Sequence, residues 1–272
     1  MEVYPEHKDA AAVVATMPML ISVRNTQFKV APAQHSAFWQ GVADGSWESD
    51  TFAIFEQFLD REHCYLDIGT WIGPTILYGC QLAKLAYGLE PDPLAYAELE
   101  TNIELNRPVS DNIRLLNVCI APTSGEVAFG SRGQGGDSTS SLLFGRKKTH
   151  WTVKALSFDD FARQYDIAAC NFIKMDIEGG EYDILPSMTA YLKAHRPTLH
   201  LSLHPCYLKI RPLGWIGRLI ARVAGTLKII RSTGFYKHVY DHNGRDISSW
   251  RLLWLCRAKI AMDIVLTDVD WR

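Results

Sequence analysis

The sequence predicts an α/β fold with a mostly parallel sheet, an antiparallel final strand and helices on both faces. Two observations support this prediction. From residue 61 onward, apolar strand-like runs alternate with segments of helical spacing, which is typical of parallel strands joined by crossover helices. The first run also ends in a glycine turn, with Gly69 and Gly73 placed before Pro74. Strand, glycine turn and helix form the opening unit of nucleotide-binding sheets.

Composition and charge narrow the class of protein. The apolar share of 47% and the charged share of 21% are those of an ordinary globular protein. A formal net charge of −2 gives no overall attraction to nucleic acid, so we predict no nucleic-acid partner. None of the cysteines forms a Cys-x-x-Cys pair, which indicates free thiols in a reducing compartment. Acidic residues precede the apolar stretch 10–21, where a secretion signal needs basic ones, so we expect a cytoplasmic protein with a short N-terminal helix.

Residues 1–60 are predicted to form an N-terminal extension of strands and helices. The stretch 20–30 alternates in part and suggests two short strands with a turn around Asn25. Residues 50–59 have the spacing of an amphipathic helix, with Asp50 as its N-cap. The main domain then occupies residues 61–272.

The elements of this domain follow from the same patterns. Helices are predicted at 74–82, at 94–106 and at 157–165 with Ser157 as N-cap; a fourth follows residues 178–181, restarts at Pro186 and runs to His195. Residues 131–139 are rich in Gly and Ser and are predicted to form a loop. Strands are predicted at 64–68, 83–89, 113–120, 126–129, 151–156, 172–177, 199–203, 238–248 and 260–267.

The glycine turn and a later acid suggest a nucleoside cofactor. In an open parallel sheet, ligands bind beyond the carboxyl ends of the strands. Asp67 and Gly69 follow the first strand, and Glu90 follows the second, 21 residues after Gly69, where a carboxylate suits two ribose hydroxyls. A nicotinamide dinucleotide and S-adenosylmethionine (SAM) both fit this set.

The spacing of the glycines favours SAM. Dinucleotide binders need Gly-x-Gly-x-x-Gly so that the pyrophosphate can approach the helix N-terminus. Here Thr70 and Trp71 stand where the close glycine pair would be, and Trp71 is too bulky for that approach. SAM carries no phosphate and needs an acid near its ammonium and another near its ribose. The predicted cofactor-binding residues are Asp67, Gly69, Thr70, Gly73, Glu90 and Pro91.

Five motifs, in order along the chain, resemble those of the FkbM-type SAM-dependent methyltransferases. Residues 66–73 are similar to that family's Asp-Ile-Gly-Ala-Asn-Ile-Gly turn, with Thr70-Trp71 in place of Ala-Asn and with Pro74 after the second glycine. Residues 45–48, 117–129 and 158–161 resemble further family segments. Residues 173–181 resemble Ile-Lys-Ile-Asp-Val-Glu-Gly-x-Glu, the most specific match. The resemblance implies a Rossmann-like class I methyltransferase fold and O-methylation of a sugar or another small hydroxylated natural product.

Two further strand ends suggest where the reaction occurs. Asp176 and Glu178 end one strand and His204 ends another, so Asp176 and His204 meet if the strands are neighbours. His204 is then a candidate general base oriented by Asp176, and Lys174 is the structural partner of Asp176. Asp176 with Glu178 or His204 is an alternative site for a divalent cation, although we assign no metal to the chain.

Residues 206–232 form a basic insertion in the domain. They include six Lys or Arg residues and no acid, and their apolar residues share one helical stripe, which comprises Trp215, Ile216, Leu219, Ile220, Val223 and Leu227. We expect this stripe to pack on the sheet and leave a solvated basic face. Two alternatives are a lid over the acceptor and a peripheral contact with an anionic membrane surface.

The sequence therefore predicts a SAM-dependent O-methyltransferase that acts on a hydroxyl of a sugar, glycoconjugate or other small natural product. One alternative is an NAD-dependent oxidoreductase, against which the missing Gly-x-Gly counts. The other is a binding protein that keeps the fold without catalysis, against which Asp67, Glu90 and Asp176 count.

Overall fold

The computed structural model describes residues 17–271, except 33, 132, 134, 146–148, 209–212 and 256–260. The short helix predicted near the N-terminus lies outside these residues. Within them, no helix combines the length and the hydropathy that crossing a bilayer requires. Their five cysteines are free, and four of the five are buried.

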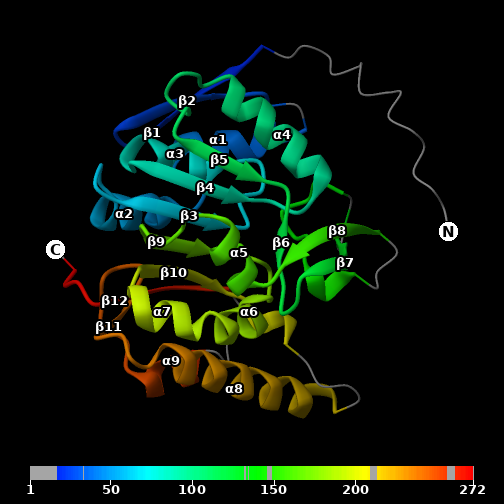
Figure 1. Ribbon diagram of the computed structural model, residues 1–272, viewed down its shortest axis with the longest axis vertical. Helices are drawn as coiled ribbons and strands as arrows, with labels where there is room; N and C mark the ends of the chain where they lie inside the picture. Colours follow the sequence, from blue (N-terminus) through cyan, green and yellow to red (C-terminus); the bar gives the residue numbers. More distant parts are fainter. Residues whose placement is uncertain are drawn as a thin grey trace.

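Seven strands of the described chain form the central sheet, in the order β11-β12-β10-β9-β3-β4-β5 (Figure 1). Neighbouring strands are parallel from β10 to β5, whereas β12 is antiparallel to both β10 and β11. This arrangement confirms the predicted α/β fold with a mostly parallel sheet and an antiparallel final strand. The strands are β3 (Cys64–Ile68), β4 (Leu85–Leu89), β5 (Ile113–Leu116), β9 (Cys170–Met175), β10 (Thr198–Leu203), β11 (His238–Asp241) and β12 (Met262–Thr267).

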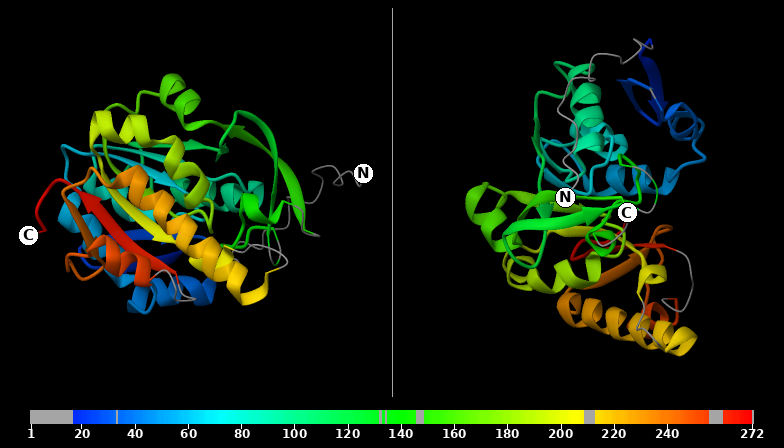
Figure 2. Two further views of the ribbon diagram at one scale, coloured as in Figure 1. Left: turned by 90° about the horizontal axis from the view of Figure 1, so that it is seen from below. Right: turned by 90° about the vertical axis from the view of Figure 1, so that its right-hand side faces the viewer.

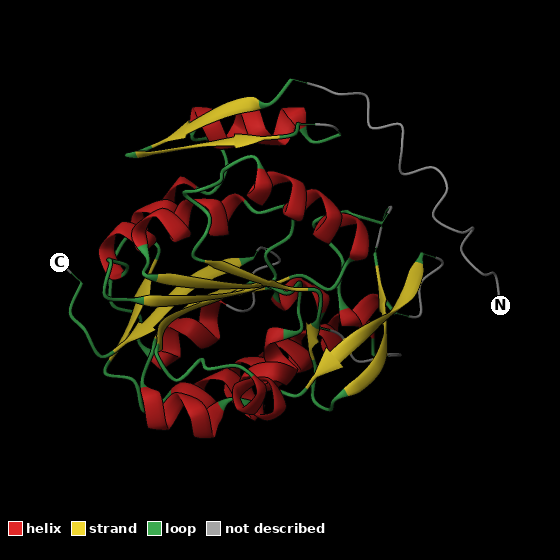
Figure 3. Cartoon of the chain, turned by 45° about the horizontal axis from the view of Figure 1, so that its top comes forward, coloured by secondary structure: helices red, strands yellow, loops and turns green. Residues whose placement is uncertain are grey.

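Helices cover both faces of this sheet (Figure 3). On one face, α3 (Pro74–Leu82) and α4 (Pro93–Glu104) pack into an apolar core together with the N-terminal elements. On the other face, a second core is built from β-strand side chains and residues of α5 (Phe158–Gln164), α6 (Glu181–Ser187), α7 (Thr189–His195) and α8 (Gly214–Thr233). The side chain of Ser157 accepts a hydrogen bond from the amide of Asp160, so it caps α5 as predicted.

The N-terminal extension packs directly on the domain. β1 (Met19–Val23) and β2 (Thr26–Val30) form the predicted hairpin, followed by α1 (Ser36–Asp44) and α2 (Ser49–Phe58). Phe52 and Phe55 of α2 are buried against the domain's own aromatic residues Tyr65 and Tyr78. Helix α2 begins one residue before Asp50, so the predicted N-cap is wrong. Asp50 instead lies in the first turn, where the helix dipole also favours an acid.

The predicted strand 113–120 is two strands in different sheets. The chain leaves the central sheet after Leu116, and Asn117 donates a side-chain hydrogen bond to the backbone oxygen of Glu90 at 2.7 Å, which holds the bend. β6 (Cys119–Ile120) then joins a small sheet with β7 (Gly125–Gly130) and β8 (His150–Leu156), in the order β6-β8-β7. Alternating apolar residues continue across the bend, so the pattern could not reveal it.

Two other predicted boundaries are also wrong. The strand 238–248 stops at Asp241, whose side chain accepts hydrogen bonds from the amides of Asn243 and Arg245 and so closes a turn before α9 (Ser249–Leu255). The helical segment after Glu181 is interrupted at Met188 and not at Pro186, which lies in the last turn of α6. Short 3₁₀ turns occur at Leu142–Phe144 (η1) and Pro205–Tyr207 (η2).

The turn after β3 touches the end of β9 through its backbone. Gly69 has a φ of +92°, and a Cβ atom at this position would lie 1.9 Å from the carbonyl oxygen of Asp176. The amide of Asp176 also donates to the carbonyl of Ile68 at 3.0 Å. Only glycine fits both the left-handed backbone and this close approach.

We predict that Gly69→Ala destabilises the protein far more than Gly45→Ala. Gly45 also has a positive φ, +77°, but an added Cβ meets nothing within 4 Å there. The free energy of unfolding should fall by about 1 kcal/mol in the Gly45→Ala control, from backbone strain alone. In Gly69→Ala it should fall by about 3 kcal/mol or more. Urea denaturation measures both losses. Similar losses for the two variants would show that the contact with Asp176 imposes no constraint.

Candidate active site

A cavity lies beyond the carboxyl ends of β3, β4 and β9. Its empty volume is about 580 Å³, which includes space open to solvent. Three of the predicted cofactor-binding residues, Gly69, Glu90 and Pro91, line it. Apolar residues 118–120, which follow β5, form part of the wall. We refer to this space as the first cavity.

Glu90 presents a buried carboxylate to the first cavity. Its two oxygens accept hydrogen bonds from the amides of Trp71 and Asp92, at 2.8 and 2.7 Å. Burial raises the pKa of Glu90 to about 8, although these two amides act in the opposite direction. A carboxylate has about four acceptor sites, so two remain for the hydroxyls of a ligand. This geometry fits the predicted contact with a ribose.

A second cavity adjoins the first on the side of the N-terminal extension. Its empty volume is about 600 Å³, and Phe38, Trp47 and Glu48 of the extension form one wall. Thr70 and Lys174 contribute to the opposite wall. Both cavities are lined by Gly69, Trp71, Ser138, Asp176 and Glu178. The two spaces therefore meet at the end of β9.

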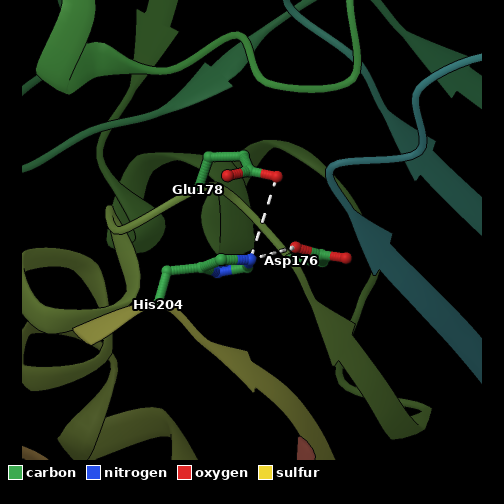
Figure 4. Close-up of side chains that lie close together, drawn as sticks. All are labelled: Asp176, Glu178 and His204. Atoms are coloured by element: carbon green, nitrogen blue, oxygen red, sulfur yellow. Dashed lines mark ion pairs between the residues drawn. The ribbon is translucent and has the colours of Figure 1, made fainter. Parts of the chain in front are cut away.

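Asp176, Glu178 and His204 lie together at this junction (Figure 4). Strands β9 and β10 are parallel neighbours, so their ends are adjacent, as expected. The Nε2 atom of His204 is 3.8 Å from Oδ1 of Asp176 and 3.8 Å from Oε1 of Glu178. Figure 4 shows the imidazole pointing toward both carboxylates. The two acids line the cavities, and the histidine supports them from behind.

Glu181, and not Asp176, orients His204. The Nδ1 atom of His204 donates a hydrogen bond to Oε1 of Glu181 at 3.2 Å. The same oxygen accepts hydrogen bonds from the amides of Ile177 and Gly179, so the fully buried Glu181 also closes the loop after β9. The prediction that Asp176 orients the histidine is therefore wrong. A carboxylate at the start of a helix gave no sign of this second role.

The charge on His204 argues against the predicted role as general base. Burial alone would lower the pKa of His204, but its hydrogen bond to Glu181 and the charges of Asp176, Glu181 and Glu178 outweigh burial and raise the pKa to about 10. The imidazole is then cationic at neutral pH and has no lone pair to accept a proton. His204 acts as a counter-ion that positions the two acids.

Lys174 is a second buried counter-ion. Its Nζ lies 3.4 Å from Oδ2 of Asp176, which agrees with the predicted structural pairing. Burial lowers the pKa of Lys174, but the charges of Asp176, Asp67 and Glu48 outweigh burial and raise it. The ammonium thus remains charged inside the protein and neutralises part of the acidic cluster.

Glu48 belongs to the site although the sequence did not indicate a role for it. Burial and then the charge of Asp176 raise the pKa of Glu48 to about 7. The hydroxyl of Thr51 donates a hydrogen bond to its Oε2 at 3.3 Å. The signal that could have identified it is its place in the family-like motif at residues 45–48. Only the folded chain shows that this motif reaches the end of β9.

The remaining predicted cofactor residues lie around and behind the turn. Thr70 lines the second cavity, while its hydroxyl hydrogen-bonds the backbone oxygens of Asp67 and Leu89. Asp67 is fully buried and lines neither cavity; its Oδ2 accepts a hydrogen bond from Thr75, and its Oδ1 has no partner. Gly73 precedes α3 with a φ of +101° and packs against Leu99, where a Cβ would come within 2.8 Å. Direct cofactor contact by Asp67 and Gly73 stays a prediction.

The junction also has the donor set of a cation site. Asp176 and Glu178 each offer a carboxylate oxygen and His204 offers a ring nitrogen. These three atoms lie within 4.8 Å of one another. Two carboxylates and an imidazole suit several divalent ions. A cation would have to displace the proton that His204 holds, because a ligating imidazole must be neutral.

The chain is similar to known methyltransferases. The family model described as "Methyltransferase FkbM domain" matches residues 67–214. The hexuronic acid methyltransferase AglP of Haloferax volcanii is 21% identical over 177 residues, which are 65% of this chain and 71% of that protein.

Two solved structures were also found. Methyltransferase FkbM from Methylobacillus flagellatus KT is 18% identical, with a TM-score of 0.48 over 77% of this chain. The match spans 44% of that longer chain. TYW2 of M. jannaschii, solved in complex with AdoMet, is 14% identical, with a TM-score of 0.40 over 91% of this chain and 83% of that one.

We predict that His204 makes the protein less stable at alkaline pH. A group whose pKa rises from 6.5 in the unfolded chain to about 10 in the folded one stabilises the fold fully below pH 6.5, and this contribution disappears as the pH rises through about 10. The free energy of unfolding of the wild type should therefore fall between about pH 7 and pH 10. In His204→Gln, the fall in the free energy of unfolding over this pH range should be smaller by about 1 kcal/mol or more.

Urea denaturation at several pH values measures this slope. His242→Gln is the matched control, because His242 is an exposed histidine on the turn after β11. If His204→Gln retains the wild-type slope, the imidazole is not the group that holds the proton.

Proposed function

The chain belongs to the FkbM family of SAM-dependent methyltransferases, and we propose that it transfers a methyl group to a hydroxyl of a sugar, glycoconjugate or similar small molecule. The observation that carries this proposal is the meeting of two cavities at Asp176 and Glu178. A methyl donor in one and an acceptor in the other would face each other across these carboxylates. Methyl transfer requires this in-line approach of the two substrates.

The first cavity suits the nucleoside part of SAM. Glu90 has free acceptor sites for the ribose hydroxyls, and the apolar wall at residues 118–120 suits a flat base. Bound SAM supplies a methyl group on a positively charged sulfur. The acidic groups at the junction would favour a cation there, because the surrounding charges are predominantly negative.

The second cavity has the composition of a site for a hydroxylated acceptor. Phe38, Trp47 and Trp71 offer aromatic surface, and Glu48 and Lys174 offer polar groups. Apolar walls with a few polar groups are typical of small-molecule sites. The methylation of a hexuronic acid by the relative named above is consistent with a sugar acceptor.

Within this proposal, Asp176 accepts the proton of the acceptor hydroxyl. Its carboxylate faces both cavities, and its position is determined by Lys174, by His204 and by the backbone contact with Gly69. Glu178 shares His204 as a counter-ion and lies beside the same junction. Burial raises the pKa of Glu178, and the cationic His204 acts against this rise.

Four free cysteines of the described chain are buried, which is consistent with a reducing compartment, and we propose that the protein is cytoplasmic.

The alternatives of an NAD-dependent oxidoreductase and a non-catalytic binding protein differ from our proposal in the cofactor that they bind and in whether they catalyse a reaction. Cofactor titration distinguishes the oxidoreductase from a methyltransferase, and a turnover assay distinguishes the binding protein from an enzyme.

We predict that the protein binds SAM and S-adenosylhomocysteine but not NAD. Isothermal titration calorimetry measures the three affinities directly. Glu90→Gln should weaken SAM binding by about tenfold, because an NH₂ group replaces one of the two acceptor oxygens. NAD binding without SAM binding would contradict the proposed cofactor and favour the oxidoreductase.

We predict that Asp176→Asn lowers turnover by about 100-fold or more, because an amide cannot accept the proton, while SAM affinity stays within about twofold of wild type. Asp183→Asn is the control, since Asp183 is an exposed acid on α6. It should leave both quantities unchanged. Equal losses of turnover and SAM affinity in Asp176→Asn would assign Asp176 a structural role.

The same turnover assay in excess EDTA tests the cation alternative. We expect full activity, because the proposed transfer of the hydroxyl proton to Asp176 requires no metal ion. Loss of activity that Mg²⁺ or Mn²⁺ restores would show that Asp176, Glu178 and His204 hold a divalent ion.

A further inference from the structure

Helix α8 buries small and polar residues and leaves apolar ones outside. Its buried residues are Gly217, Arg222, Gly225, Thr226, Ile229, Ser232 and Thr233. Gly225 lies against Tyr182 of α6, where a Cβ would come within 2.9 Å. The guanidinium of Arg222 donates a hydrogen bond to the backbone oxygen of Pro205 at 3.0 Å. The body of the protein therefore holds α8 by its small and polar face.

Half of the apolar stripe is exposed, while its other members, Leu219, Val223 and Leu227, are half-buried. Trp215, Ile216 and Ile220 are 68%, 48% and 46% exposed, and Leu213 just before the helix is 52% exposed. Our expectation that the stripe packs on the sheet is therefore wrong. The physical reason is that α6 and α7 already cover that part of the sheet, so α8 forms an outer layer.

Helix α9 packs beside α8 and carries two exposed tryptophans. Leu252 anchors α9 in the core that includes Ile229 of α8, while Trp250 and Trp254 are 82% and 67% exposed. Figures 1 and 2 show α8 and α9 at the edge of the molecule opposite the β1–β2 hairpin. Of the twelve large hydrophobic residues that are exposed in the described chain, half belong to this surface. We call it the α8–α9 surface.

Positive charge is concentrated in the same two segments. Residues 206–232 and 249–260 contain nine Lys or Arg residues and no Asp or Glu. The rest of the chain contains 19 basic and 30 acidic residues, so the chain is strongly polarised despite a net charge of −2. Arg218, Arg231 and Arg251 are exposed beside the apolar residues. Lys228 is also exposed and pairs with Asp183 of the neighbouring α6 at 3.4 Å.

From this combination we propose that the α8–α9 surface binds the interface of an anionic membrane. Exposed Trp and Ile residues enter the boundary between headgroups and acyl chains, and Lys and Arg contact the lipid phosphates. Each basic residue near an anionic surface strengthens binding. A second copy of this chain is a poorer occupant, because two such positively charged surfaces repel each other.

The inner face of α8 contacts the loop that follows β10. Pro205, to which the buried Arg222 donates its hydrogen bond, follows His204 directly, and the ring of Tyr207 stacks on that of His204 with 5.8 Å between centroids. The second cavity lies on the side of the N-terminal extension, so the membrane contact is proposed independently of where the acceptor binds.

Co-sedimentation with vesicles tests the proposal. We expect the protein to bind vesicles of phosphatidylcholine mixed with phosphatidylglycerol and to remain free with phosphatidylcholine alone. The double variant Trp215→Ser/Ile220→Ser should bind the mixed vesicles about tenfold or more weakly, because two apolar side chains no longer enter the lipid. Arg218→Glu should also bind the mixed vesicles more weakly than the wild type. This difference should grow as the ionic strength is lowered, because the changed charge is then screened less.

Leu20→Ser/Val109→Ser is the matched control, because both residues are similarly exposed but lie outside this surface. It should bind vesicles as the wild type does. Unchanged melting temperature and SAM affinity in all variants show that they fold. Absence of vesicle binding, or binding that Trp215→Ser/Ile220→Ser leaves unchanged, would overturn the proposal. Self-association of the wild type that the double variant abolishes would instead assign the surface to a second copy. None of these outcomes alters whether the protein binds SAM and transfers methyl groups.

Discussion

The close approach of the Gly69 turn to the end of β9 is the constraint on which the rest of the site depends. Strands β3 and β9 are parallel neighbours, so their carboxyl ends emerge side by side. A side chain at position 69 would collide with the carbonyl of Asp176, and only glycine allows the two backbones to touch. This contact places the cofactor turn against the acids at the end of β9. Donor and acceptor sites can then share one junction.

The second theme is the balance of buried charge. Asp67, Glu48, Asp176, Glu178 and Glu181 lie close together in a region with little solvent. Two cations, on Lys174 and His204, oppose these acids. Burying unpaired charges is costly, so these cations are needed for the acids to be held at all. This need accounts for the raised pKa of His204 beside Asp176, Glu178 and Glu181.

The N-terminal extension and the helices α8 and α9 lie at opposite edges of the molecule (Figure 1). The N-terminal extension supplies Phe38, Trp47 and Glu48 to the second cavity, so it is part of the site and not only a covering layer. At the other edge, α8 and α9, with Leu213 just before α8, present six of the twelve exposed large hydrophobic residues of the described chain.

Local pattern was enough to determine the fold class, most strands, the β1–β2 hairpin and the glycine turn after β3. Each of these depends on periodicity, glycine spacing or capping between residues that are near in sequence. Tertiary structure alone decided that Glu181 holds His204, that Glu48 reaches Asp176, and that the stripe on α8 faces outward. These outcomes depend on contacts between distant segments, and the charge of His204 depends on three carboxylates acting together. A helical stripe shows which residues share a face, but the neighbours already packed on the sheet decide where that face points.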